Sequence, residues 1–143
     1  MSTSLEDQQS IRQLLARYCF LLDGYRLREF AALFTSDGEW TSRNGTGRGP
    51  AAIETLLRGL VPEPAPGKRR KHFTGNVIIE LFGDRASVVS NFMVARDSET
   101  VPAIAVAGTY EDTVVKTAEG WKFKSRKLSH DIAGESGLNV TPD

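Results

Sequence analysis

The chain has 143 residues, of which 40% are hydrophobic and 25% charged, as expected for one globular domain and not for a disordered chain. Its 18 basic and 18 acidic side chains cancel, which excludes a generally electropositive nucleic-acid binder and gives no attraction to membrane surfaces. One cysteine, Cys19, and two histidines, His72 and His130, exclude an intramolecular disulfide, a multi-thiolate metal site and a three-histidine metal centre. The first residues lack the basic and apolar segments of a secretory signal, and no apolar run approaches the ~20 residues of a membrane span, so we expect a cytoplasmic protein.

The first sixty residues carry the spacing of helices. Apolar residues recur at helical intervals over residues 5–22, with Ser4 as the expected N-cap. Gly24 is expected to end this helix in the left-handed conformation. A second helix is predicted over residues 26–34, and a third begins at Pro50, whose missing N–H costs nothing in a first turn.

The rest of the chain has the pattern of strands. A short strand is predicted at residues 39–41 and an antiparallel meander at residues 72–82, 86–96, 103–116 and 121–129. Gly75 and Gly108 are expected positions for bulges that curve the sheet. The alternation over residues 121–126 is typical of an outer strand. The sequence predicts an α+β fold in which helices close one side of a curved antiparallel sheet and enclose a pocket. We expect one domain over residues 1–132 and a flexible C-terminal tail over residues 133–143.

Three residues are candidates for chemistry in this pocket. His72 opens a strand, and histidine changes charge near neutral pH as a general base must. It could also be a surface residue that continues the basic run of residues 68–71. Asp23 could orient an imidazole, or bind local backbone N–H groups before Gly24. Tyr18 could donate a hydrogen bond to a substrate oxygen, or belong to the apolar core. Tyr18 and Asp23 lie ~140° apart on an ideal helix, so they share a pocket only if the helix loosens near Gly24.

Two further segments could bind anions, but each also has an ordinary structural explanation. The glycine-rich residues 45–49 precede a helix as a phosphate-binding loop would, but they lack the Lys-Ser/Thr of a P-loop and favour a flexible loop. The basic residues 68–71 could attract an anion, although such a short run is usually a solvated surface.

Seven short segments occur in a fixed order over residues 5–130: 11–18, 22–23, 30–40, 49–53, 72–73, 108–112 and 120–126. Together they resemble the SnoaL-like branch of the nuclear transport factor 2-like superfamily, in particular its scytalone dehydratase, bile-acid 7α-dehydratase and hexachlorocyclohexane dehydrochlorinase-like members. The resemblance implies a cone-shaped α+β barrel of three helices on a strongly curved sheet. It also implies a homodimer or homotrimer, and no cofactor or metal.

The same resemblance implies a function. Asp23 and His72 occupy the positions of a catalytic pair, and Tyr18 matches a tyrosine of the bile-acid enzyme. We expect a cofactor-free lyase of the dehydratase or elimination type, acting on a hydrophobic cyclic, polyketide-, terpene- or steroid-like molecule. His72 would be the general base and Asp23 the residue that orients it.

Two alternatives stay open: a non-catalytic small-molecule-binding domain, or an assembly module such as the small subunit of a ring-hydroxylating oxygenase.

Overall fold

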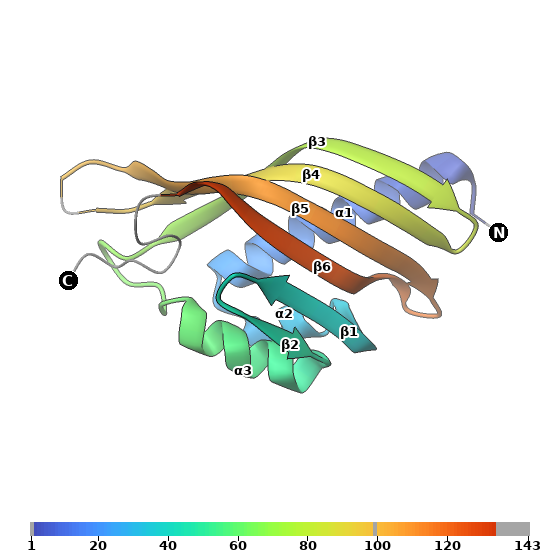
Figure 1. Cartoon of the computed structure of the whole chain (residues 1–143), viewed down its shortest axis with the longest axis horizontal. Coiled ribbons are helices and arrows are strands. Elements are labelled where there is room, and N and C mark those ends of the chain that lie inside the picture. Colours follow the sequence, from blue (N-terminus) through green and yellow to red (C-terminus); the bar gives the residue numbers. More distant parts are fainter. Residues whose placement is uncertain (1, 99, 134–143) are drawn as a thin grey trace.

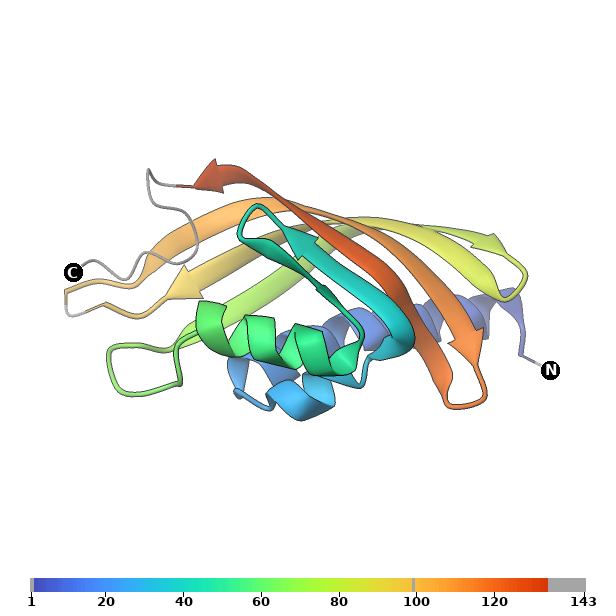
Figure 2. The same ribbon diagram turned by 60° about the horizontal axis from the view of Figure 1, so that its bottom comes forward.

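A curved sheet of six strands packs on helices in the computed structural model, which describes residues 2–98 and 100–133 (Figures 1 and 2). The elements are α1 (Ser4–Asp23), α2 (Leu27–Ala31), β1 (Phe34–Ser42), β2 (Gly45–Arg48), α3 (Pro50–Leu60), β3 (Arg70–Phe82), β4 (Arg85–Arg96), β5 (Ala103–Thr117) and β6 (Gly120–Ala133). The predicted α+β cone is confirmed. Residues 134–143 of the predicted tail lie outside the described residues, and Ala133 is the last residue of β6.

The strand order is β2-β1-β6-β5-β4-β3. Strands β3 to β6 form the predicted antiparallel meander, whereas β1 pairs in parallel with β6. The sheet does not close, and the helices lie against its concave face: α1 runs along β3, and α3 packs on the β1–β2 hairpin (Figure 2). No helix among the described residues is long and apolar enough to cross a bilayer.

Helix α1 begins and ends one residue away from the predicted signals. Thr3, not Ser4, is the N-cap: its hydroxyl accepts the Glu6 N–H at 3.2 Å, and its own N–H donates to the Glu6 carboxylate at 2.6 Å. These two bonds form a capping box. At the other end Gly24 has φ −80°, and Tyr25 takes the left-handed conformation with φ 58°. The expectation for Gly24 is wrong because the reversal that ends the helix falls one residue later.

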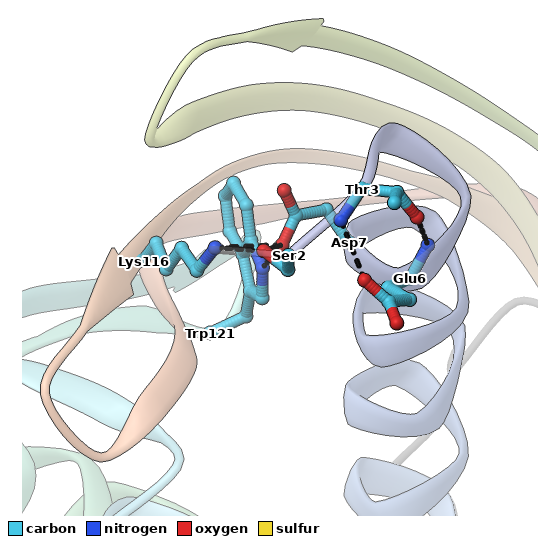
Figure 3. Close-up of polar contacts among 6 residues, drawn as sticks. All are labelled: Ser2, Thr3, Glu6, Asp7, Lys116 and Trp121. Atoms are coloured by element: carbon cyan, nitrogen blue, oxygen red, sulfur yellow. Dashed lines mark hydrogen bonds and ion pairs between the residues drawn. The ribbon is translucent and has the colours of Figure 1, made fainter.

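The first turn of α1 is tied to the β5–β6 hairpin through Asp7 (Figure 3). Its carboxylate accepts hydrogen bonds from Ser2 at 2.8 Å and from the Trp121 indole at 3.1 Å, and it pairs with Lys116 at 3.0 Å. The hydrogen bond from Lys116 is the main reason that the pKa of Asp7 lies below its ordinary value. The start of α1 is therefore fixed to the β5–β6 hairpin.

Irregular register curves the sheet at both predicted glycines. The pairing of β3 with β4 shifts after Gly75, where Asn76 has φ 55°. The pairing of β5 with β6 shifts at Gly108, and a Cβ on Gly108 would lie 1.9 Å from the Ser129 carbonyl oxygen. No side chain fits there without moving the neighbouring strand. Close strand approach at Gly108 is thus part of the curvature.

Three local expectations are wrong. The second helix ends at Ala31, and β1 starts already at Phe34. The glycine-rich residues 45–49 are no flexible loop: most of them form β2, and Gly47 approaches the backbone of α3, where a Cβ would lie 3.0 Å from the Ile53 Cα. Strand β6 does not keep a simple alternation, because its register with β5 shifts around Lys124. The shift turns Arg126 into the core, where it is 0% exposed.

Candidate active site

Asp23 and His72 contact each other through two hydrogen bonds. Asp23 is the last residue of α1, and His72 is the third residue of β3. One carboxylate oxygen lies 2.6 Å from His72 Nδ1, and the other accepts the His72 backbone N–H at 2.9 Å. The structure thus brings together two residues that are 49 positions apart in the chain.

This geometry assigns the protons of the imidazole. An ionised carboxylate only accepts, so Nδ1 carries hydrogen and Nε2 has the free electron pair when the ring is neutral. The bond to the backbone N–H holds the carboxylate in place, and the side chains of His72 and Asp23 are only 7% and 18% exposed. The pair has the arrangement in which a carboxylate orients an imidazole and stabilises it when it takes up a proton.

His72 lies between two cavities. The inner cavity, between the sheet and the helices, has a volume of about 30 Å³ and includes His72 in its wall. The outer groove, between α1 and β3, has a volume of about 360 Å³ and is lined by both His72 and Asp23. Asp23 lines the outer groove but not the inner cavity. Since Nδ1 is engaged by Asp23, Nε2 is the ring nitrogen left to act on a bound molecule.

The inner cavity is mostly apolar. Its wall consists of Tyr18, Leu22, Trp40, Asn44, Leu57, Leu60, Val61, Arg70, His72, Phe92, Tyr110 and Leu128. A few polar groups in an apolar wall are typical of small-molecule sites.

Tyr18 lies in this wall and in the core at once. It is 0% exposed, and its hydroxyl accepts a 2.9 Å hydrogen bond from the Trp40 indole. Burial is the largest cause that raises its pKa, so the phenol stays protonated. Helix α1 continues without loosening to Asp23, and the angular separation of the two residues persists: Tyr18 faces the inner cavity and Asp23 faces β3. His72 bridges them, because it touches Asp23 and lines the cavity of Tyr18.

Sequence reasoning missed a buried ion pair beside this cavity. Arg126 on β6 donates two 2.8 Å hydrogen bonds to Asp112 on β5, and both side chains are 0% exposed. Burial opposes the charge of Arg126, but the Asp112 carboxylate, together with Tyr18 and Tyr110, more than offsets it, so the pKa of Arg126 is raised. The guanidinium carbon lies 4.2 Å from the ring centre of Tyr18 and 3.7 Å from that of Tyr110. The alternation of β5, in which Tyr110 and Asp112 share a face with buried valines, could have indicated Asp112; the register shift concealed Arg126.

Several buried polar groups have no hydrogen-bond partner among the described residues. They are Ser90 Oγ, the Tyr110 hydroxyl, Arg126 Nη1 and both ring nitrogens of His130. Of these residues, only Tyr110 lines the inner cavity. Burial lowers the pKa of His130, and the nearby charge of Arg43 lowers it further.

Some side chains of the basic residues 68–71 lie on the surface, and others line the cavities of the site. Arg69 pairs with Asp97 at 3.0 Å on the surface, whereas Arg70 lines the inner cavity. Lys71 contributes to the outer groove. The run is therefore more than a solvated surface, since one of its side chains reaches the cavity wall.

Comparisons with known proteins agree with this architecture. A family model described as a SnoaL-like domain matches residues 3–127. A protein of unknown function from Mycobacterium tuberculosis has a TM-score of 0.81 at 25% identity, over 97% of this chain and 84% of its own. An NTF2-like protein with a cystatin-like fold from Novosphingobium aromaticivorans has a TM-score of 0.80 at 27% identity, over 93% of this chain and 87% of its own.

A third structure, a protein provisionally assigned as a scytalone dehydratase from the same organism, has a TM-score of 0.77 at 29% identity, over 90% of this chain and 86% of its own. The sequence matches none of the curated proteins. Because the family model spans most of the chain and the fold agrees with these structures, the chain belongs to the SnoaL-like family.

Proposed function

We propose that this protein is a cofactor-free lyase of the dehydratase or elimination type, acting on a hydrophobic cyclic small molecule, with His72 as general base. The observation that carries the proposal is the double contact of Asp23 with His72. The likeness to a provisionally assigned scytalone dehydratase supports the same class of reaction.

The proposed step is a proton transfer coupled to elimination. His72 Nε2 takes a proton from a carbon next to a carbonyl group or β to a leaving group. The electron pair of that C–H bond forms the new double bond, and the leaving group departs with the electrons of its own bond. Asp23 stays ionised and balances the imidazolium, while Tyr18 donates a hydrogen bond to a substrate oxygen. A positioned base contributes about 10²–10⁴-fold to the rate.

Substrate entry requires the inner cavity to widen. About 30 Å³ holds one water molecule, whereas small-molecule pockets span roughly 300–1,000 Å³. Leu60 and Val61, at the end of α3, lie in the cavity wall and are partly exposed. We propose that displacement of this rim opens the site, because the rest of the wall, apart from Asn44 in the β1–β2 turn, belongs to the sheet or to the buried faces of helices.

The test uses 5-nitrobenzisoxazole, a flat bicyclic probe that any positioned base can open. Removal of its ring proton breaks the N–O bond and releases a coloured nitrophenolate, so no natural substrate is needed. We expect wild-type turnover to fall about 10²–10⁴-fold in His72→Gln. His130→Gln is the matched control, because it alters the only other histidine of the chain and should keep wild-type turnover.

Other results would favour the alternatives. Equal turnover in wild type and His72→Gln would refute the general base. Binding of the probe without turnover would favour a non-catalytic binding domain, and a stable complex with a different chain would favour the assembly module.

We also propose a homo-oligomer, a dimer or a trimer, that covers the outer face of the sheet. Phe73, Ile78 and Phe82 of β3 are on that face and are 51%, 62% and 63% exposed. Exposed apolar groups that gather on one surface mark interaction sites. Light scattering coupled to size-exclusion chromatography should show a dimer or trimer for the wild type. The substitution Ile78→Lys should dissociate it, whereas the loop control Val101→Lys should leave it intact. A monomeric wild type would refute the proposal.

A further inference from the structure

Tyr110 lines the inner cavity and carries a hydroxyl that has no hydrogen-bond partner among the described residues. The residue is 0% exposed. A buried hydroxyl is normally paired, because an unpaired one loses its bonds to water without replacement. Since Tyr110 lines the same cavity as His72, a molecule in that cavity can supply the missing acceptor.

The surroundings of Tyr110 keep its hydroxyl protonated and place a positive charge beside its ring. Burial raises the pKa of Tyr110 well above its ordinary value, so the phenol keeps its proton throughout the neutral range. The charged guanidinium of Arg126 lies over the ring, with its carbon 3.7 Å from the ring centre. A fixed positive charge at this distance stabilises negative charge that develops next to the hydroxyl.

Tyr110 differs from the other polar groups nearby. The Tyr18 hydroxyl already accepts a hydrogen bond from Trp40, so it has one partner within the protein. Ser90 Oγ and Arg126 Nη1 are also unpartnered among the described residues, but neither residue lines the cavity. Within the described part of the chain, Tyr110 alone combines a location in the cavity wall with a hydroxyl that has neither donor nor acceptor.

The walls around Tyr110 indicate what kind of molecule presents the acceptor. Its ring stacks on Phe92, with ring centres 4.3 Å apart and planes 23° apart, and both rings line the cavity. Leu57 and Leu128 complete an apolar wall. Such surroundings suit a flat, apolar ring that carries one oxygen.

We propose that Tyr110 donates a hydrogen bond to a carbonyl or phenolic oxygen on a flat apolar ring bound in the inner cavity. This inference rests on the proposed function, in which His72 removes a proton from the same molecule. Tyr110 then binds the oxygen on which negative charge develops as the proton leaves. The substrate class narrows to cyclic ketones, enones and phenols.

Binding of two matched probes tests the inference without turnover. Neutral 4-nitrophenol carries the hydroxyl oxygen, nitrobenzene lacks it, and both quench tryptophan fluorescence; Trp40 lies in the cavity wall. We expect wild type to bind 4-nitrophenol about tenfold more tightly than nitrobenzene, as one hydrogen bond allows, and Tyr110→Phe to lose this preference. Tyr25→Phe is the control, since Tyr25 is the one tyrosine outside the cavity wall.

Turnover of 5-nitrobenzisoxazole separates this inference from the proposed function. We expect Tyr110→Phe to lower kcat/KM about tenfold or more, with the remaining activity still dependent on His72. Loss of the phenol preference with no effect of His72→Gln would refute only the general base. An unchanged preference in Tyr110→Phe, or binding of neither probe by wild type, would overturn the inference.

Thermal unfolding excludes a merely structural role. Without ligand, Tyr110→Phe removes a hydroxyl that has no partner, so the melting temperature should stay level or rise. A clear fall relative to Tyr25→Phe would mean that the hydroxyl is needed inside the protein, and would overturn the inference.

Discussion

Asp23→Asn should disable His72 by reversing its tautomer. Asp23 offers two acceptor oxygens, one to the His72 backbone N–H at 2.9 Å and one to Nδ1 at 2.6 Å. Asparagine has one oxygen and one NH₂ group. If its oxygen keeps the backbone bond, its NH₂ group faces Nδ1 and forces that nitrogen to accept. The ring hydrogen then moves to Nε2, the atom that must take the substrate proton.

The size of the effect follows from this reversal. An imidazole with hydrogen on Nε2 has no free electron pair there. The whole rate contribution of the general base, about 10²–10⁴-fold, should therefore be lost. We expect 5-nitrobenzisoxazole turnover in Asp23→Asn to fall nearly as far as in His72→Gln. The surface control Asp84→Asn, in the exposed β3–β4 turn, should keep wild-type turnover.

The tautomer itself can be measured by NMR. Two-bond ¹⁵N–¹H correlations of the imidazole, recorded where the ring is neutral, show which nitrogen carries hydrogen. His130 gives the only other histidine signal, and His130→Gln assigns it. Hydrogen on Nδ1 of His72 in wild type and on Nε2 in Asp23→Asn is the expected result. The same tautomer in both proteins, together with a large loss of turnover, would refute the reasoning, because the loss would then have another cause.

Two further predictions concern the fold. Gly108→Ala should destabilise the protein by ~1–3 kcal/mol in urea unfolding, because its Cβ would lie 1.9 Å from a backbone oxygen, whereas Gly75→Ala, with open space around it, should change little. Asp7→Asn should lower stability mainly above about pH 4: Lys116 lowers the pKa of Asp7 below 3.8, so its stabilisation is present above that value and is lost as pH falls through the lower folded pKa. Parallel unfolding curves for wild type and Asp7→Asn that stay equally far apart at low pH would contradict this.

The sequence predicted elements best where local patterns and tertiary packing agree. The apolar spacing of α1 and the meander of β3 to β6 are both confirmed, and Gly75 and Gly108 lie at register shifts. The contact between Asp23 and His72 depends on how α1 lies along β3. Local spacing cannot supply that placement, so only the family resemblance brought the two residues to one site before the structure was known.

The wrong expectation for β6 has a physical cause. One extra residue in a strand reverses the faces of every residue after it, and nothing in the local pattern around Lys124 signals the shift. Arg126 was therefore assigned to an outer strand, although it is fully buried. The role proposed for Tyr110 could not be predicted from the sequence either. It depends on a buried hydroxyl without a partner, which only the tertiary structure shows.

The ion pair of Asp112 and Arg126 is a poor choice if stability alone matters. Removing two charges from water costs several kcal/mol each, and apolar residues of similar volume often replace a buried pair with no loss or with a gain of stability. Breaking the pair by Asp112→Asn alone should cost ~3–5 kcal/mol, because an uncompensated charge remains buried. The double substitution Asp112→Leu with Arg126→Met should instead unfold at a urea concentration equal to or above that of wild type.

The same double variant separates stability from chemistry. It removes the positive charge that lies over the rings of Tyr18 and Tyr110, so turnover of 5-nitrobenzisoxazole should fall while the fold persists. If turnover stays at the wild-type level, the charge has no part in the reaction and the pair serves only packing. If stability falls with turnover, the geometry of the two bonds to Asp112 organises the core itself. A loss of turnover in a stable protein is the expected result, because the Arg126 guanidinium lies over the rings of both Tyr18 and Tyr110.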